Sequence, residues 1–458
     1  MDFISRLEGF PDVLEKIFVN LDVATISETE KVSTTWMRLI TSLDIWKCVW
    51  KTNMRRVPRW KTLSVRMEHV QPQLAERLNE GSASSYREAC LFVDGNFQQI
   101  SQSVKRNVTL RALKNEDEDE YANSHRLVTS DFRINDVYAF VGLNSSLRIF
   151  NRWTKQLVKE INTYVSVEEM QLNERFFVVL LGSVQLSGFR IEVYDVQELV
   201  LIQAFTIEKN DRKLHMKLGL GSDVLVFTTE FKEIDLGFKE SGHLMIHVHR
   251  WNPSAAQFVS ESETKLEVGT FDYQLYVHGK YLIFDFYFNV DIQFDMNMKI
   301  QLPINMDTKN QILVYSLETM ELVRERQFIN LRMGAIQKEY FDGGIVVEVC
   351  NADGQPSVAF WDVILDTLQP IAEHPEQFVR SFAMAHHPFQ IAVFEPNEKQ
   401  IKLSLIQRGQ LTGNPVIPMH SECTFFHRRP FHPYQFYYDG VQMFARSLHE
   451  IRVADLVG

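Results

Sequence analysis

Two stripes of apolar residues predict that the first part of the chain is helical. In each stripe, apolar side chains recur at the spacing of about 3.6 residues that places them on one face of a helix. The first stripe is Val13, Leu14, Ile17, Phe18 and Leu21, and the second is Val32, Trp36, Leu39, Ile40 and Leu43. Pro11 suits a first helical turn, and Asp22 can cap the helix that follows it. The pattern predicts a helical hairpin of about 40 residues, a size at which a lone core is marginal.

The pattern changes to short strands from residue 108 onward. β-branched and aromatic residues alternate with polar ones between turn residues spaced by about eight to twelve positions, which is typical of all-β architecture. One strand recurs seven times, and its copies end at Asn151, Asp195, Arg250, Ser316, Asp362, Leu405 and Asp455. The spacing of 43 to 66 residues between copies matches four-stranded propeller blades with insertions. The sequence therefore predicts a seven-bladed β-propeller. Kelch-type blades, or six blades with one repeat miscounted, are the alternatives.

The two ends of the repeat region predict how such a ring closes. The last copy ends three residues before the last residue, so it has no room for a fourth strand. Residues 107–113 have the alternation to supply that strand, and such closure removes the open edge of the ring. The Trp-Asp signature of WD repeats occurs once, at Trp361-Asp362, so the repeat is a degenerate WD-like one. The insertion at residues 289–310 is expected to project from one rim as a binding loop.

Residues 10–46 resemble an F-box, a helical docking module. F-box sequences run from a Leu-Pro pair through aliphatic residues and a Leu-Asp pair to Val-Ser, Trp, Leu-Ile and a final Leu-x-x-Trp. The matching positions are Pro11, Leu14, Ile17, Phe18, Leu21, Asp22, Val32, Ser33, Trp36, Leu39, Ile40, Leu43 and Trp46. The departures are Phe10 in place of Leu, Asp12 in place of Glu, Thr25 in place of an acidic residue and Thr34 in place of a basic one.

The resemblance implies that this segment binds the Skp adaptor of a Skp–cullin–F-box ubiquitin ligase. Its apolar residues would supply partly the segment's own core and partly the surface that packs against the adaptor. These residues are Phe10, Pro11, Leu14, Ile17, Phe18, Leu21, Ile26, Val32, Trp36, Leu39, Ile40 and Trp46. The alternative is a small helical subdomain that packs only on its own chain.

These features together predict an α+β multidomain protein. A small all-α F-box domain at residues 1–54 is followed by a helical linker at 55–107 and a WD-like β-propeller at 108–458, with residues 107–113 closing the last blade. The linker contains Tyr86-Arg87-Glu88, followed by Asn96 beside an aromatic residue. This arrangement is similar to the bridge in F-box proteins that have WD repeats.

Composition narrows the classes of partner. The net charge of −11 and the pI near 5.7 argue against a nucleic-acid partner. The longest apolar run is residues 176–181, too short for a membrane span, so no membrane partner is expected. The N-terminus lacks the basic and then apolar pattern of a signal peptide. The four cysteines are scattered without a CxxC motif, which fits a reducing compartment. A cytoplasmic or nuclear location, or both, is the prediction.

Residues capable of catalysis or metal binding do not form a recognisable pattern. His386-His387 and the series His420, Cys423, His427 and His432 match no standard zinc spacing, so no metal and no cofactor is expected. No Ser/His/Asp spacing has a nucleophile-elbow context, so the predicted role is non-catalytic. A propeller enzyme would instead need polar residues that converge on the innermost strands.

Three arginines are a candidate substrate-binding set. Arg332, Arg380 and Arg428 are each 48 residues apart, which places them at similar heights on adjacent blades. Guanidinium groups match phosphate oxygens, so the hypothesis is that they bind an acidic or phosphorylated segment. Surface arginines paired with nearby carboxylates are the alternative.

The sequence thus predicts a substrate-recognition adaptor of a Skp–cullin–F-box ubiquitin ligase. Its expected partners are the Skp adaptor, the cullin scaffold and a substrate protein, with or without phosphorylation. Acceleration would come from holding the substrate close to the ubiquitin-charged enzyme. The alternatives are an interaction scaffold that does not direct ubiquitination and a propeller enzyme with a site in the central channel.

Overall fold

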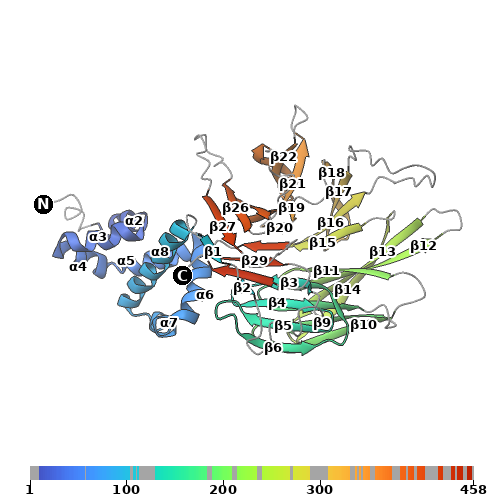
Figure 1. Cartoon of the computed structure of the whole chain (residues 1–458), viewed down its shortest axis with the longest axis horizontal. Coiled ribbons are helices and arrows are strands. Elements are labelled where there is room, and N and C mark those ends of the chain that lie inside the picture. The colour runs from blue at the N-terminus through green and yellow to red at the C-terminus, as the bar shows by residue number, and fades with distance from the viewer. Residues whose placement is uncertain are drawn as a thin grey trace.

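The protein has a helical region at one end and a region of antiparallel sheets at the other (Figure 1). The computed structural model describes residues 10–56, 58–103, 107–109, 111–112, 129–182, 188–208, 214–234, 240–268, 272–288, 308–330, 336–337, 340–341, 344–350, 356–373, 382–387, 390–396, 400–407, 421–426, 435–438, 441–446 and 451–455.

The helical region begins with short helices that polar caps separate. Asp22 accepts the backbone N–H of Thr25 at 2.7 Å, and Ser33 accepts that of Trp36 at 3.2 Å, so each starts a new helix. The helices are α2 (Pro11–Val19), α3 (Val23–Val32), α4 (Thr34–Ser42), α5 (Ile45–Arg56), α6 (Pro58–Val70), α7 (Pro72–Asn79) and α8 (Ala83–Ser103).

Two details differ from the predicted hairpin. The second apolar stripe does not form one helix, because Ser33 is extended and caps α4, which leaves Val32 as the last residue of α3. The predicted boundary between residues 54 and 55 falls inside α5, so it marks no break in secondary structure.

The strands form seven sheets within the described residues, here called sheets 1 to 7 in chain order. In each of the first four, a strand pairs antiparallel with the next along the chain. We call the strand named first the innermost strand, because these strands contact one another: β3 with β7, β7 with β11, and β11 with β15. Sheet 1 is β3 (Thr129–Ile134), β4 (Tyr138–Leu143), β5 (Ser146–Asn151) and β6 (Leu157–Asn162). Sheet 2 is β7 (Ser166–Leu172), β8 (Phe176–Gly182), β9 (Gly188–Asp195) and β10 (Leu201–Glu208). Sheet 3 is β11 (Leu214–Leu220), β12 (Val224–Ile234), β13 (Glu240–Asn252) and β14 (Gln257–Val268), and sheet 4 is β15 (Asp272–His278), β16 (Tyr281–Phe288), β17 (Thr308–Ser316) and β18 (Leu322–Asn330).

The last three sheets complete the series. Sheet 5 is β20 (Tyr340–Phe341), β21 (Gly344–Cys350), β22 (Pro356–Asp362) and β23 (Thr367–Glu373). Sheet 6 is β24 (Phe382–His387), β25 (Gln390–Pro396), β26 (Gln400–Gln407) and β27 (Ser421–Phe426), extended by β19 (Ile336–Gln337) and β1 (Asn107–Thr109). Sheet 7 is β28 (Gln435–Tyr438), β29 (Gln442–Arg446) and β30 (Ile451–Asp455), with β2 (Arg111–Ala112) beside β30.

The N-terminal strand segment is shared between two sheets. Arg111 and Ala112 pair antiparallel with β30, which gives sheet 7 its fourth strand. Residues 107–109 instead pair parallel with β27 of sheet 6. Only part of the segment 107–113 therefore joins the last sheet.

One turn recurs between the third and fourth strands of sheets 1 to 5. A side-chain oxygen at the first turn position accepts the backbone N–H groups two and three residues later, and the fifth residue has positive φ. The first residues are Asn151, Asp195, Asn252, Ser316 and Asp362. In sheet 3 the residue equivalent to these turn-starting residues is therefore Asn252 and not Arg250, at which the sequence repeat was predicted to end. The reason is that β13 ends two residues later than its sequence alternation indicates.

Apolar cores join neighbouring sheets. Sheets 1 to 5 share buried residues pairwise, as where Phe140 of sheet 1 stacks on Phe177 of sheet 2 with ring centroids 4.2 Å apart. Strands of sheets 5 and 6, and of sheets 6 and 7, are also in contact. Sheet 7 in turn packs on sheet 1 in one core that contains Phe132, Phe150 and Phe444. A further core joins the helices to sheet 7 through Val441 and Met443.

Candidate functional site

The predicted docking residues divide into three groups by burial. Six of them form the core of the helical region, each at most 6% exposed: Leu14, Phe18, Ile26, Leu39, Ile40 and Trp46. Half-buried residues are Ile17, Leu21 and Trp36, and exposed residues are Phe10, Pro11 and Val32. Half of the predicted set therefore holds the helices together, and the other half is at least partly accessible to a partner.

Four large apolar side chains on the first helices face solvent. Phe10 and Val32 are 60% and 64% exposed, and Val13 and Met37 are 44% and 50% exposed. Phe10 is the residue directly before α2, and Val13 lies in the first turn of that helix. We call Phe10, Val13, Val32 and Met37 the exposed helical residues. Val13, Val32 and Met37 belong to α2–α4 and Phe10 directly precedes α2, and these helices form the end of the molecule farthest from the sheets (Figure 1). Val13 is in the predicted apolar stripe although it is exposed, because apolar periodicity does not distinguish a core position from a solvent-exposed one. Met37 is in neither stripe.

A half-buried carboxylate links three helices of this region. Glu30 of α3 accepts the indole N–H of Trp46 at 2.6 Å and the Nε–H of Arg87 at 2.7 Å. Trp46 belongs to α5 and Arg87 to α8, so one side chain links three helices. The Arg87 guanidinium also lies 5.9 Å from the centroid of the Trp46 ring. The helices that carry the exposed helical residues are thus linked to α5 and α8 by side-chain hydrogen bonds.

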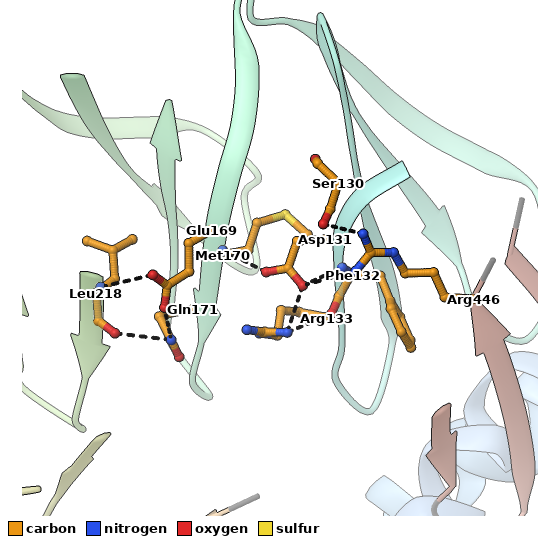
Figure 2. Close-up of polar contacts among 9 residues, drawn as sticks. All are labelled: Ser130, Asp131, Phe132, Arg133, Glu169, Met170, Gln171, Leu218 and Arg446. Atoms are coloured by element: carbon orange, nitrogen blue, oxygen red, sulfur yellow. Dashed lines mark hydrogen bonds and ion pairs between the residues drawn. The ribbon is translucent and has the colours of Figure 1, made fainter. Parts of the chain in front are cut away.

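The innermost strands of sheets 1 to 3 form a second cluster of polar residues. Strand β7 contacts β3 on one side and β11 on the other. From β3, Asp131 accepts the N–H of Met170 on β7 at 2.9 Å with one oxygen, and that of Phe132 at 2.8 Å with the other (Figure 2). Arg133 donates to the same second oxygen at 3.0 Å.

A second carboxylate repeats the arrangement one sheet further on. From β7, Glu169 accepts the N–H of Leu218 on β11 at 3.2 Å and the side-chain N–H of Gln171 at 2.9 Å (Figure 2). Gln171 also donates to the carbonyl of Leu218 at 3.2 Å. Desolvation raises the pKa of the Glu169 carboxyl above its ordinary value, although the positive charge of Lys217 opposes the shift.

Arg446 connects this network to the last sheet. It comes from β29, donates to the carbonyl of Ser130, and its guanidinium lies 3.9 Å from Asp131 (Figure 2). Polar residues do converge on innermost strands, which is the arrangement that a channel enzyme would need. Both oxygens of Asp131 accept hydrogen bonds from the protein itself, however, and so do both oxygens of Glu169. The geometry favours a role in joining adjacent sheets over a role in general acid–base chemistry.

The predicted substrate-binding arginines and most of the predicted binding loop lie outside the described residues. Arg332, Arg380 and Arg428 all lie outside them, so their predicted alignment stays a prediction. Residues 289–307 of the insertion lie outside as well. Within the described part of the chain, no group of three or more His, Cys, Asp or Glu side chains is placed to hold a metal ion. None of the described helices is long and apolar enough to cross a bilayer.

The comparisons with known proteins show a likeness of fold alone. No protein-family model matches the chain, and no curated protein matches its sequence. Among solved structures, the WD40 repeats of RRP9 are 11% identical with a TM-score of 0.42, covering 76% of this chain and 99% of that one. The Dos1 propeller is 10% identical with a TM-score of 0.38, covering 76% and 81%. An acylaminoacyl peptidase from Pyrococcus horikoshii is 11% identical with a TM-score of 0.40, covering 72% and 50%.

Proposed function

We propose that this protein is the substrate-recognition adaptor of a Skp–cullin–F-box ubiquitin ligase. In this proposal α2–α4 dock on the Skp adaptor, and the seven sheets are the blades of one ring that binds a substrate protein. The observation that supports it most is the set of exposed helical residues, which lies within the F-box-like segment and above a fully formed core. The core does not need these four side chains, which leaves them available to contact a partner.

The burial pattern agrees with a docking module in energetic terms. Removing a large, half-exposed apolar side chain from water contributes about 1 to 2 kcal/mol. Four such side chains together contribute about 4 to 8 kcal/mol before the cost of association, which is part of what a specific complex needs. The Glu30 links reduce that cost, because the helices need not reorganise on binding.

The proposed ring rests on the contacts between sheets. Sheets 1 to 5 are joined pairwise by cores, later neighbours are in contact, and sheet 7 packs on sheet 1. A ring with its first and last blades in contact is rigid, so a substrate bound to it would keep a fixed distance from the helical end. Fixed geometry is what catalysis by proximity requires.

Direct binding to a purified Skp adaptor tests the proposal. We expect the full chain to bind, and Val13→Glu with Met37→Glu to weaken the affinity by about 100-fold or more, because each substitution places a charge in an apolar contact. The matched control is Val158→Glu with Val259→Glu, at similarly exposed apolar positions on the sheets. Calorimetry measures both affinities, and circular dichroism checks that each variant is folded.

Two outcomes would reject the proposal in different ways. If the wild-type chain does not bind the adaptor, or if both double variants bind as well as the wild type, the F-box assignment is wrong. If the adaptor binds as expected but the turnover of captured proteins does not change on depletion of this chain, the protein is an interaction scaffold rather than a ligase subunit.

A further inference from the structure

A histidine of sheet 3 packs against aromatic rings where sheets 2 and 3 meet. His249 of β13 is 9% exposed. Its ring centroid lies 4.9 Å from that of Phe205 on β10 of sheet 2, edge to face, and 5.1 Å from that of Phe227 on β12 of its own sheet, stacked. Both phenylalanines pack in the apolar core that joins the two sheets. His249 is therefore part of the contact between sheets 2 and 3, and we call His249, Phe205 and Phe227 the histidine joint.

One ring nitrogen of His249 has no place for a proton. The Nδ1 atom is buried and has no hydrogen-bond partner in the described part of the chain. A neutral imidazole has one nitrogen without a proton, and Nδ1 can be that nitrogen. In the imidazolium both nitrogens are donors, so Nδ1–H would be a buried donor of a charged group without an acceptor. The histidine joint therefore accommodates a neutral His249 and opposes a protonated one.

The neighbouring histidine differs, because both of its ring nitrogens have polar partners. His247 lies two residues earlier on the same face of β13. Its Nδ1 is 3.2 Å from a carboxylate oxygen of Glu263 on β14, and its Nε2 is 3.3 Å from the hydroxyl of Thr229 on β12. A proton added to His247 has an acceptor, whereas a proton added to His249 Nδ1 has none. His249 is thus the residue of the pair whose protonation conflicts with the packing.

The other side chains that face His249 do not supply the missing acceptor. Among the described side chains of β10, those that face sheet 3 cannot ionise, and neither can those of β12 or Ser260, the residue of β14 opposite His249. The residues of β10 and β12 are Gln203, Phe205 and Ile207, and Leu225, Phe227 and Thr229. The ionisable residues on this face of β13 and β14 are His243, His247, Glu263 and Lys265.

Burial sets the direction in which the joint responds to pH. Desolvation lowers the pKa of His249 below its ordinary value of 6.5, the positive charge of His247 adds to the shift, and the carboxylate of Glu263 opposes it. An opened or unfolded chain therefore takes up this proton first as the pH falls. The contribution of the joint is fully present above about pH 6.5 and is lost as the pH falls through the pKa of His249 in the closed joint.

Other contacts join sheets 2 and 3 on either side of the joint. The side-chain amide of Gln203 on β10 accepts the N–H of Phe258 at 2.7 Å and donates to its carbonyl at 3.0 Å. On the innermost strands, Glu169 and Gln171 both bond to the backbone of Leu218. Strand β10 is the edge of its sheet and pairs only with β9. An opening at His249 is therefore confined to the part of β10 that follows Gln203.

We propose that the histidine joint is a pH-sensitive switch between sheets 2 and 3. At neutral pH His249 is neutral and the joint is closed. In an acidic environment His249 takes up a proton from solvent at Nδ1, and Phe205 and the end of β10 separate from β12 and β13. The new N–H group then reaches water, and Phe227 is exposed, while the innermost strands stay joined. The switch does not depend on the function proposed for the helical end.

Hydrogen exchange followed by mass spectrometry tests the switch on the purified full chain. Exchange is measured at pH 7.5 and pH 5.5, with times corrected for the intrinsic pH dependence of amide exchange. Because only the open form binds the proton readily, its population rises by about tenfold at one pH unit below 6.5. We expect peptides of β10 to exchange about tenfold faster at the lower pH, and peptides of β7 and β11 to change by less than about twofold.

Histidine variants assign the response to one side chain. His249→Phe keeps an aromatic ring that cannot be protonated, so peptides of β10 should exchange at the same corrected rate at both pH values. His249→Gln, neutral and without a ring, should likewise remove the difference between the two pH values. His247→Gln removes the neighbouring positive charge, so the response should remain and begin at a higher pH. The matched control is His215→Gln, at an exposed position of β11, which should leave the response unchanged.

Several results would overturn the proposal. One is that peptides of β10 exchange at the same corrected rate in wild type at both pH values, and another is that both His249 variants keep the acid response or that His215→Gln removes it. A third is that peptides of β7 and β11 accelerate as much as those of β10, since acid would then unfold whole sheets instead of opening the joint. Circular dichroism at pH 7.5 checks that each variant is folded.

Discussion

The helical end and the innermost strands differ in whether their unusual residues are satisfied by the protein itself. At the helical end, Phe10 and Val32 are apolar and left in solvent, above a core that is complete without them. On the innermost strands, Asp131 and Glu169 have polar carboxyl groups, yet one oxygen of each accepts an N–H group of the neighbouring strand and the other accepts an N–H group of its own strand. Exposed apolar residues that the core does not require are candidates for contact with a partner, whereas polar residues that are hydrogen-bonded within the protein serve its stability.

The same criterion applies along the seam between the first and last sheets. Arg152 is fully buried, and its guanidinium donates to Gln442 of β29 and to the carbonyl of Asn135, each at 2.8 Å. The ring of Trp153 lies 4.5 Å from it. A buried guanidinium is costly unless it is fully paired, so this group belongs to the internal class.

The largest expected effect comes from breaking that seam. Arg152→Ala should lower the free energy of unfolding by about 3–5 kcal/mol, because it leaves buried acceptors without their donor. The measurement is the midpoint of denaturant unfolding, followed by circular dichroism. Arg250→Ala is the matched control, since Arg250 pairs with Glu261 on the surface and should cost under about 1 kcal/mol. Equal shifts in the two variants would contradict the assignment of Arg152 to the seam.

The next effect separates core from surface within α2. Leu14→Ala removes a side chain that is 0% exposed and should cost about 2–5 kcal/mol, whereas Val13→Ala, one residue away, should cost within about 0.5 kcal/mol. Thermal unfolding followed at 222 nm compares the two. A comparable loss in Val13→Ala would mean that Val13 supports the fold, and the contrast between the exposed helical residues and the core would fail.

Local periodicity accounts for most of what the sequence predicts correctly. The 3.6-residue stripe of α2 and the cap at Asp22 depend on neighbouring residues, and both appear in the structure. The recurring strands likewise fall in successive sheets, because each strand and its turn form a local unit. The predicted end of the third copy at Arg250 is two residues too early, because β13 is longer than the other strands and ends at Asn252.

Long-range pairing accounts for what could not be predicted. Alternation indicates which face of β3 holds Asp131, but not that its partner is the backbone N–H of Met170, 39 positions away. Backbone donors have no sequence signature. Periodicity also cannot say that Val32 is exposed, because exposure depends on where Ser33 ends the helix.

The smallest expected effect is a pH dependence of the inner-strand network. Because desolvation raises the pKa of Glu169 in the folded chain, the unfolded chain loses this proton first as the pH rises. The contribution of Glu169 is therefore fully present below the ordinary Glu pKa of about 4.5 and is lost as the pH rises through the folded pKa. Glu169→Gln should remove that loss, because its amide oxygen still accepts the Leu218 N–H and has no proton to release. Denaturation midpoints from pH 4 upward compare the variant with the wild type, and Glu198→Gln, at an exposed turn position, is the control. If the denaturation midpoints of the wild type and Glu169→Gln differ by the same amount at every pH in this range, the Glu169 carboxyl is solvated. The inner strands would then be as open to solvent as the helical end.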